Sequence, residues 1–489
     1  MEWRPRTGER RLWAAAALAC SAVLGYLGTG LAPIAALTWL APLPVLLLAP
    51  RVPARTALGV AFGAYLLGTA NSWAFQLHSH DEPMVPVGLT INIGMSLTFV
   101  LTVWLFRSLA GRGRALLAAV APAAAWTGVL YLVATVNPHG LMGTFANDQG
   151  DRPLVLQATA VAGMWAVEFL VMFAPCVVAA LLAPAAPRAA RLRTAAVGVL
   201  TFGAVLGFGI LGLRGTAGPP QRVAAIAPNR YAWAPPVSDG LVAGYVREIE
   251  NLPEGVRTVV LPEAAFGSDE ADPAALTQPM RQVARARGVD IVLGFVQAPA
   301  QGRGVDNVAL IFPADGGSPA RYLKQHDLVS RPGHDLVFAP RTRTGAEICA
   351  DVDFARPSRD YGAAGTSLLA IPASDNGGNG WQHSRAALLR GVENGLPVVW
   401  AAQNGTLMIS DGRGRVLAQA RSEGPARFTT ITADVTGPVA TFYSRHGDWF
   451  AWLCLAAALS GLIAALPATR RRAGTRRSPD KAAASGGRQ

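Results

Sequence analysis

The chain has 489 residues, 51% of them hydrophobic, and its mean hydropathy is positive. It is too long for one ordinary domain and too apolar for a soluble protein of this size, so the composition excludes a single soluble domain. The formal net charge of +12 does not indicate nucleic-acid binding, because residues 215–447 are neutral, with 22 basic and 22 acidic residues.

Eight stretches of the chain approach or exceed the roughly 20 apolar residues that a helix needs to cross a bilayer. They lie at about 12–30, 33–49, 56–76, 86–106, 114–136, 156–183, 194–213 and 449–467. The second stretch is short and interrupted by proline, so it is either re-entrant or spanning. The first follows Arg10 and Arg11, as a signal peptide would, but seven more candidates follow it. We therefore expect an uncleaved first helix and a polytopic α-helical membrane protein with about eight spans.

Two polar features interrupt this apolar half. His78 and His80 occur in "HSHDEP", which is explained more simply by a short exposed loop than by a metal site. No cluster in the sequence has zinc-ligand spacing, so we expect no metal and no other cofactor. Glu168 lies inside the sixth predicted span, where a carboxylate is costly and often functional. The alternative for Glu168 is a neutral, hydrogen-bonded group within the bundle.

The basic residues of the membrane half predict its orientation. If the N-terminus is cytoplasmic and the chain crosses eight times, 19 basic residues fall in inner segments, and only Arg152 and Arg214 fall in outer ones. This asymmetry predicts cytoplasmic termini and an outer location for the long neutral segment. The expected organisation is a membrane bundle at 1–214, an outer domain at 215–447, a final transmembrane helix at 448–468 and a disordered basic tail at 469–489.

The outer segment begins with the Gly/Pro linker "GTAGPPQ" and then alternates β-rich and helical patterns. This alternation predicts an α/β domain with buried sheets. The β-rich runs are 222–228, 256–266, 289–296, 307–313, 345–354, 366–374 and 396–405, and the helical patterns are 238–251, 273–287 and 380–394.

Three residues of the outer segment stand at the ends of apolar strand runs. Glu263 follows "TVVLP", Lys324 follows "ARYL" and Cys349 follows "AEI". Catalytic groups often sit where a rigid strand gives way to a loop. A carboxylate can deprotonate a thiol, the thiolate can attack a carbonyl, and an ammonium can stabilise the oxyanion. Together the three residues form a complete set for acyl transfer.

Residue usage singles out two of these three residues. Cys349 is the only cysteine in 215–447, so no disulfide can form within that segment, and an exported unpaired thiol is open to oxidation. Lys324 is the only lysine before the tail in a chain with 41 arginines. Lysine offers a compact charge suited to one developing oxyanion. The alternatives are a buried core thiol for Cys349 and a chance surface lysine for Lys324.

At these residues the sequence resembles the nitrilase superfamily, and the chain as a whole resembles the apolipoprotein N-acyltransferase family. The matching stretches are "LPEAAF", "YLKQHDLV", "EICADVDF", "NSWAF" and "GWQHSRAALLRGVENGLPVVWAAQNGTLMISDGRGRV". The resemblance implies an αββα sandwich inserted between membrane helices. It also implies that Glu263 is the general base, Lys324 the oxyanion stabiliser and Cys349 the nucleophile.

The reaction implied by the resemblance is a ping-pong acyl transfer in the bacterial cytoplasmic (inner) membrane. A phospholipid would be the acyl donor and would leave a thioester on Cys349. The N-terminal amine of a diacylglyceryl-cysteine lipoprotein would be the acceptor. Both partners are lipids, and the catalytic domain would lie on the extracytoplasmic face.

The sequence departs from the family pattern around the three residues. The family usually follows its lysine with Pro-Phe-Gly-Glu, whereas this chain has "LVSRPGHDLVFAP", with His334 and Asp335 at the place of that glutamate. The family's Cys-Tyr-Glu is here Cys349-Ala350-Asp351. Asp351 or Asp335 could supply the missing carboxylate, or both could be ordinary loop residues.

Three functions therefore stay open on the sequence. The first is the lipoprotein N-acyltransferase that the resemblance implies. The second is a nitrilase-fold amidase or acyltransferase with another amine acceptor, because the loops after Lys324 and Cys349 are altered. The third is a catalytically silent paralogue that binds a lipid or a partner, against which the intact Glu263, Lys324 and Cys349 argue.

Overall fold

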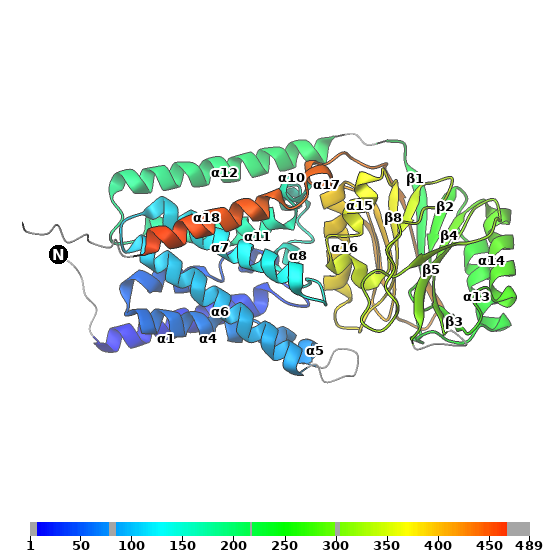
Figure 1. Ribbon diagram of the computed structural model, residues 1–489, viewed down its shortest axis with the longest axis horizontal. Coiled ribbons are helices and arrows are strands. Elements are labelled where there is room, and N and C mark those ends of the chain that lie inside the picture. Colours follow the sequence, from blue (N-terminus) through cyan, green and yellow to red (C-terminus); the bar gives the residue numbers. More distant parts are fainter. Residues whose placement is uncertain (1–6, 78–84, 216–217, 299–303, 467–489) are drawn as a thin grey trace, which may run out of the picture.

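The computed structural model describes residues 7–77, 85–215, 218–298 and 304–466. The predicted tail at 469–489 and the histidines at 78 and 80 lie outside these residues. The described chain forms two parts that follow one another along the long axis of the molecule (Figure 1). One part is a bundle of helices, and the other is a sandwich of two sheets with helices on both outer faces.

The bundle is built from long apolar helices that pack through small residues. Its main members are α1 (Thr7–Gly28), α4 (Ala54–Gly68), α6 (Val85–Ala110), α7 (Ala115–Val136), α11 (Met164–Leu181), α12 (Arg188–Arg214) and, returning after the sandwich, α18 (Trp449–Ala465). α7 packs against α6, α11 and α18, and its alanine-rich face is buried. Helices that place alanine or glycine at their contacts can approach closely without an aqueous hydrophobic driving force.

Five of these helices have the length and composition to cross a membrane: α1, α6, α7, α11 and α12. The predicted count of about eight spans is not confirmed. α18 has 17 residues and α4 has 15, because α4 ends at Gly68 and the chain continues through a short 3-10 turn. The predicted span at 33–49 is broken into α2 (Ala35–Thr38), α3 (Leu43–Leu48) and a 3-10 turn (Ala49–Arg51), around its prolines.

The sandwich contains two β-sheets with helices outside each. The first sheet has the strand order β12-β1-β2-β4-β5-β6, with β3 paired to β4, and the second has the order β11-β10-β9-β8-β7. The strands are β1 (Gln221–Pro228), β2 (Val256–Val260), β3 (Phe266–Ser268), β4 (Asp290–Gln297), β5 (Asp306–Phe312), β6 (Ala320–Leu323), β7 (Thr344–Ala346), β8 (Leu368–Ser374), β9 (Val398–Gln403), β10 (Thr406–Ser410), β11 (Val416–Arg421) and β12 (Phe428–Val435). The predicted αββα architecture is therefore confirmed.

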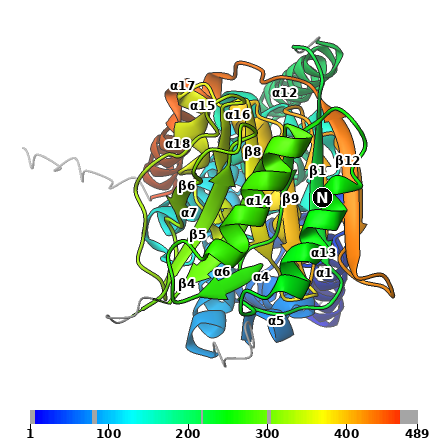
Figure 2. The same cartoon turned by 90° about the vertical axis from the view of Figure 1, so that its right-hand side faces the viewer.

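The two outer helix layers have different surroundings. α13 (Asp239–Glu250) and α14 (Ala274–Arg287) cover the first sheet and bury only one face each (Figure 2). α16 (Gly380–Asn394) covers the second sheet and is buried along nearly its whole length. α16 also contacts α8 (Phe145–Asp148), α10 (Thr159–Ala162) and α17 (Phe442–His446), so it lies between the sandwich and the bundle.

Candidate active site

Glu263 is fixed between the two sheets just after β2. Its backbone N–H donates to the Ala373 carbonyl at 3.2 Å, and its own carbonyl accepts from the Gln403 side chain at 2.8 Å. Both partners belong to strands of the second sheet, β8 and β9. The Glu263 side chain is 2% exposed. Its carboxylate is therefore held at a set position in the interior, facing the ends of the strands.

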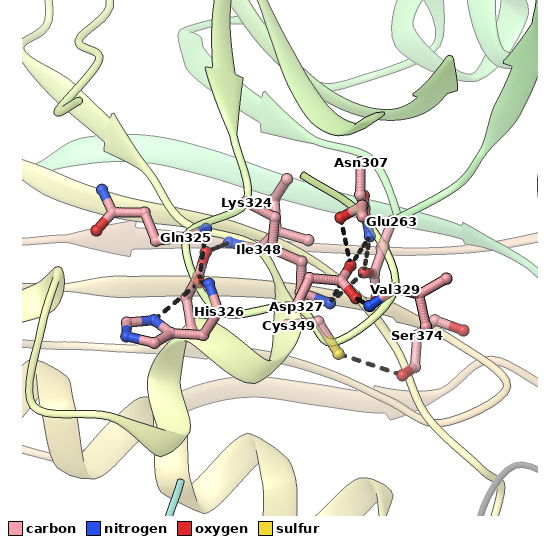
Figure 3. A network of polar contacts seen from close by, with 12 residues as sticks. Glu263, Asn307, Lys324, Gln325, His326, Asp327, Val329, Ile348, Cys349 and Ser374 are labelled. Carbon is pink, nitrogen blue, oxygen red and sulfur yellow. Dashed lines mark hydrogen bonds and ion pairs between the residues drawn. The ribbon is translucent and has the colours of Figure 1, made fainter. Parts of the chain in front are cut away.

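Lys324 follows β6 and reaches the same carboxylate. Its backbone N–H donates to the Asn307 carbonyl at 2.9 Å, which fixes the residue beside β5. Its Nζ lies 2.9 Å from Glu263 Oε1 and 3.8 Å from Asp327 Oδ2. The Asn307 amide donates to the same Glu263 oxygen at 2.7 Å (Figure 3). Two donors therefore fix the position of one oxygen of Glu263 beside the ammonium of Lys324.

Cys349 begins a 3-10 turn, η4 (Cys349–Asp353), three residues after the last residue of β7. Its φ of +44° lies in the left-handed region, which costs a non-glycine residue about 1–3 kcal/mol and is typical of functional turns. The side chain is 7% exposed, and its Sγ donates to the Ser374 carbonyl at 3.4 Å. The turn thus places Cys349 in the same cluster as Glu263 and Lys324, with its sulfur directed at Ser374 (Figure 3).

The charges at this site act on one another. Burial and the Glu263 carboxylate raise the pKa of the Cys349 thiol well above its ordinary value, and Lys324 opposes that rise. Burial works to lower the pKa of Lys324, but the charges of Glu263, Cys349 and Asp327 outweigh it and raise that pKa. The lysine is therefore a permanent cation, while the resting thiol keeps its proton until a base removes it.

The structure places Asp351 behind these three residues. Its carboxylate accepts from the hydroxyl of Tyr322 at 2.7 Å and from the backbone N–H groups of Gln325, His326 and Ile348 at 2.8–3.1 Å. The hydroxyl belongs to β6, and the N–H groups belong to the loop after Lys324 and to the residue before Cys349. Asp351 thus ties the two loops together, while Asp327 is the second carboxylate close to Lys324.

The other predicted supporting residues lie away from the three. His334 and Asp335 are exposed in the loop after β6. Glu168 is fully buried in α11, where its carboxylate accepts from Trp126 Nε1 at 3.1 Å and from the Ala146 N–H at 2.7 Å. Among the described residues, no group of three or more His, Cys, Asp or Glu side chains could hold a metal ion.

Sequence reasoning missed several polar residues that border the site. Asn307 and Asp327 bind Glu263 or Lys324, and His383 on α16 pairs with Asp375 at 3.0 Å. Asn307 is a polar residue at the start of an apolar strand run, and this polar position was the signal in the sequence that could have identified it as a site residue. His383 was visible only as part of "WQH", because its neighbour Asp375 belongs to a different element.

Comparisons with known proteins match both halves of the chain. Residues 222–442 match the carbon-nitrogen hydrolase family, and residues 21–177 match the apolipoprotein N-acyltransferase N-terminal domain. Solved structures similar to part of the chain include Nit3 of Saccharomyces cerevisiae, a member of branch 10 of the nitrilase superfamily. That structure is 17% identical and has a TM-score of 0.39 over 53% of this chain and 98% of the other.

Curated relatives carry the name apolipoprotein N-acyltransferase. The one from Gloeobacter violaceus is 30% identical over 293 residues, which are 52% of this chain and 55% of the relative. The one from Geobacter metallireducens is 34% identical over 135 residues, which are 26% of this chain and 25% of the relative. The chain spans about half the length, or less, of the curated relatives it matches.

The two family matches correspond to the two parts of the fold. The match at 21–177 covers helices of the bundle, and the match at 222–442 covers the sandwich that holds Glu263, Lys324 and Cys349. Together with helices long and apolar enough to span, they indicate a bacterial membrane protein. The chain is therefore similar to apolipoprotein N-acyltransferases over its bundle and to carbon-nitrogen hydrolases over its sandwich.

Proposed function

We propose that this protein is a membrane N-acyltransferase that moves a fatty acyl chain from a phospholipid to the N-terminal amine of a diacylglyceryl-cysteine lipoprotein. The observation that carries the proposal is the meeting of Glu263, Lys324 and Cys349 from three separate loops, with the Lys324–Glu263 contact at 2.9 Å. The names of the relatives and the apolar bundle support the choice of lipid substrates.

In the first half-reaction, Glu263 takes the proton of the Cys349 thiol, and the thiolate attacks the ester carbonyl carbon of the phospholipid. The carbonyl electrons move to oxygen, where the Lys324 ammonium stabilises the negative charge. The carbon–oxygen bond to the glycerol then breaks. The lysophospholipid leaves with the proton held by Glu263, and Cys349 keeps the acyl group as a thioester.

In the second half-reaction, the acceptor amine attacks the thioester carbonyl while Glu263 takes a proton from the nitrogen. Lys324 again stabilises the oxyanion. The carbon–sulfur bond breaks, an amide forms, and the thiolate recovers its proton from Glu263. The site returns to its starting state, so the same three residues serve both halves of the cycle.

The proposed setting is the inner membrane, with the sandwich on its extracytoplasmic face. The excess of inner arginines supports this orientation. The chemistry requires both lipid substrates to reach Cys349 from one leaflet. α16 and η4 lie against the bundle, so the nucleophile is close to the helices that would sit in that membrane.

The test is the mass of the purified full chain after incubation with phospholipid, with and without a diacylglyceryl-cysteine lipopeptide. An adduct on the peptide that contains Cys349, released by neutral hydroxylamine and discharged by the lipopeptide, is expected. Cys349→Ala should abolish it, and Glu263→Gln should slow its formation roughly 10²–10⁴-fold. Cys20→Ala, which changes a cysteine of the bundle, is the matched control.

Other outcomes separate the competing functions. An adduct discharged only by a different amine would indicate another acceptor. Acylated lipopeptide without any adduct would indicate direct transfer. If neither adduct nor product appears, the protein is a silent paralogue and the proposal fails.

A further inference from the structure

A histidine between two carboxylates lies next to the segments that hold the proposed nucleophile, Cys349. His383 projects from α16, and its Nδ1 lies 3.0 Å from Asp375 Oδ1. Its Nε2 lies 3.8 Å from Asp353 Oδ2, at the end of η4. All three residues are at least nine-tenths buried. Buried ionisable groups in such an arrangement need a physical explanation.

The two carboxylates are connected directly to the loops that hold Cys349. Asp375 follows Ser374, whose carbonyl accepts from the Cys349 Sγ. Asp353 ends the 3-10 turn that Cys349 begins. Through Asp375, His383 is therefore linked to the residue whose carbonyl accepts the hydrogen bond of the thiol. Through Asp353, it is linked to the 3-10 turn that Cys349 begins.

At 3.8 Å, His383 Nε2 and Asp353 Oδ2 are farther apart than a hydrogen bond allows. His383 Nε2 and Asp353 Oδ1 are buried and have no hydrogen-bond partner among the described residues. A separation of 3.8 Å is too short to admit a bridging water. Because an unmet buried polar atom is costly, the charge on this histidine needs a physical explanation, and its contact with Asp353 Oδ2 is an electrostatic one.

The surrounding charges favour the cationic form of His383. Burial works to lower its pKa, but Asp353 from η4, Asp375 from the turn after β8 and Glu263 from the loop after β2 outweigh burial and raise it. Trp400 of β9 packs against the imidazole with ring centroids 4.7 Å apart and adds no charge. Besides His383, the cations whose charges act on Asp353 are Lys324 and Arg390.

We propose that His383 is a positioning residue that works as an imidazolium, offsetting Asp375 and Asp353 and holding η4 against the turn after β8. Asp375 disfavours the Cys349 thiolate, because its negative charge adds to that of Glu263. A cation on His383 compensates this charge and keeps the thiolate accessible. The inference deepens the proposed function, since it concerns activation of the same nucleophile, but its test needs no acyl substrate.

The experiment measures alkylation of Cys349 by iodoacetamide in the full chain, followed by mass spectrometry of the peptide that contains it, from pH 5.5 to 9.5. His383→Asn keeps a donor toward Asp375 and removes the charge. His446→Asn, on the exposed end of α17, is the matched control. The readout is the ratio of the His383→Asn rate to the wild-type rate at each pH, which a purely structural role would hold constant.

At the low end of the pH range we expect His383→Asn to react about tenfold more slowly, which corresponds to roughly one pKa unit in the thiol. The ratio should rise toward one as the pH passes through the raised pKa of His383, because the wild-type imidazole then loses its charge. Asp353→Asn removes one cause of that raised pKa. In the Asp353→Asn background, the rate of the double variant His383→Asn/Asp353→Asn divided by the rate of Asp353→Asn should therefore reach one at lower pH.

A ratio that stays constant across the pH range, both in wild type and in the Asp353→Asn background, overturns the inference. If His383→Asn does not fold, the wild-type and Asp353→Asn profiles decide, because the step caused by His383 must move to lower pH in the latter. Acyl transfer is measured separately. A pH-dependent ratio without any acyl transfer would support the role of His383 while refuting the proposed function.

Discussion

At the scale of single residues, the site depends on a cation and an amide that contact the same oxygen of Glu263. Lys324 Nζ and the Asn307 amide both reach Glu263 Oε1, at 2.9 Å and 2.7 Å. The second oxygen of Glu263 is therefore the one left to take a proton. The compact ammonium matters here, because a planar guanidinium would need more space and a forked partner.

Replacing Lys324 with arginine tests this point. Lys324→Arg keeps the charge but cannot place it at the same position, so we expect transfer to fall by roughly 10²–10³, the usual effect of losing an oxyanion donor. The measurement is turnover with phospholipid and lipopeptide. Arg321→Lys, at an exposed position of β6, is the control, because it makes the opposite exchange of an arginine for a lysine. Near wild-type turnover in Lys324→Arg would remove the lysine from the mechanism.

Glu347, two residues before Cys349, gives a prediction about stability and pH. Burial raises its pKa to about 8, opposed by the hydroxyl of Ser358, which donates to Oε2 at 2.8 Å. The folded protein thus holds a proton between about pH 4.5 and 8 that the unfolded chain releases, so stability falls as the pH rises through this window. Each pKa unit corresponds to about 1.4 kcal/mol.

Glu347→Gln should flatten this dependence. The melting temperature of the wild type in detergent should fall between pH 5 and 8, and that of Glu347→Gln should fall less. Glu250→Gln, at an exposed position on α13, should behave as wild type. Parallel melting curves for all three proteins would show that Glu347 is ionised throughout the range.

At the scale of elements, the position of Glu263 depends on a glycine in the neighbouring strand. A Cβ on Gly294 of β4 would lie 2.3 Å from the Pro262 carbonyl oxygen and 2.4 Å from the Glu263 Cα. Both contacts are with backbone, so nothing can rotate away. β4 must therefore carry glycine where the chain leaves β2 and crosses over it.

Gly294→Ala should move Glu263 away from Lys324 and reduce transfer at least tenfold, while Cys349 still reacts with iodoacetamide. Gly240→Ala in α13 is the control, because an added Cβ there meets no atom within 4 Å. Both variants are compared by turnover and by alkylation rate. Unchanged turnover in Gly294→Ala would mean that the backbone adjusts without displacing the carboxylate.

At the scale of the whole molecule, α16 and η4 connect the bundle to the nucleophile. Glu393 of α16 accepts from the Met164 N–H, at the start of α11, at 2.6 Å. Arg390, one turn earlier, pairs with Glu393 at 2.6 Å and donates to the Val352 carbonyl in η4 at 2.9 Å. A chain of buried polar contacts thus runs from a helix of the bundle to the turn that carries Cys349.

The orientation of the molecule is tested by reporter fusions. An enzyme reporter that is active only outside the cytoplasm should be active when fused after residue 230 and inactive when fused after residue 475, because inner segments hold nearly all the arginines of the membrane half. A cytoplasm-specific reporter at the same two sites should give the opposite pattern. Activity exchanged between the sites would refute both the orientation and the proposed access of lipids to Cys349.

The sequence alone was enough to predict the two-part architecture, and it singled out Glu263, Lys324 and Cys349 as candidate site residues. Apolar stretches of about 20 residues identify spanning-length helices, because the bilayer sets that length. The alternation of β-rich and helical runs identifies the α/β domain, since side-chain period follows secondary structure. Glu263, Lys324 and Cys349 were predicted because each follows an apolar run, and strand ends can be recognised locally.

Contacts between distant segments were decided only by the tertiary structure. Asp351 resembled a second active-site carboxylate, but it binds Tyr322 and three backbone N–H groups behind the site. Asp327 lies beside Lys324, and Asp353 and Asp375 flank His383 from two different loops. No local pattern encodes these pairings. The direction of a side chain at the end of a strand depends on how two sheets and a bundle pack, and that packing is a property of the whole fold.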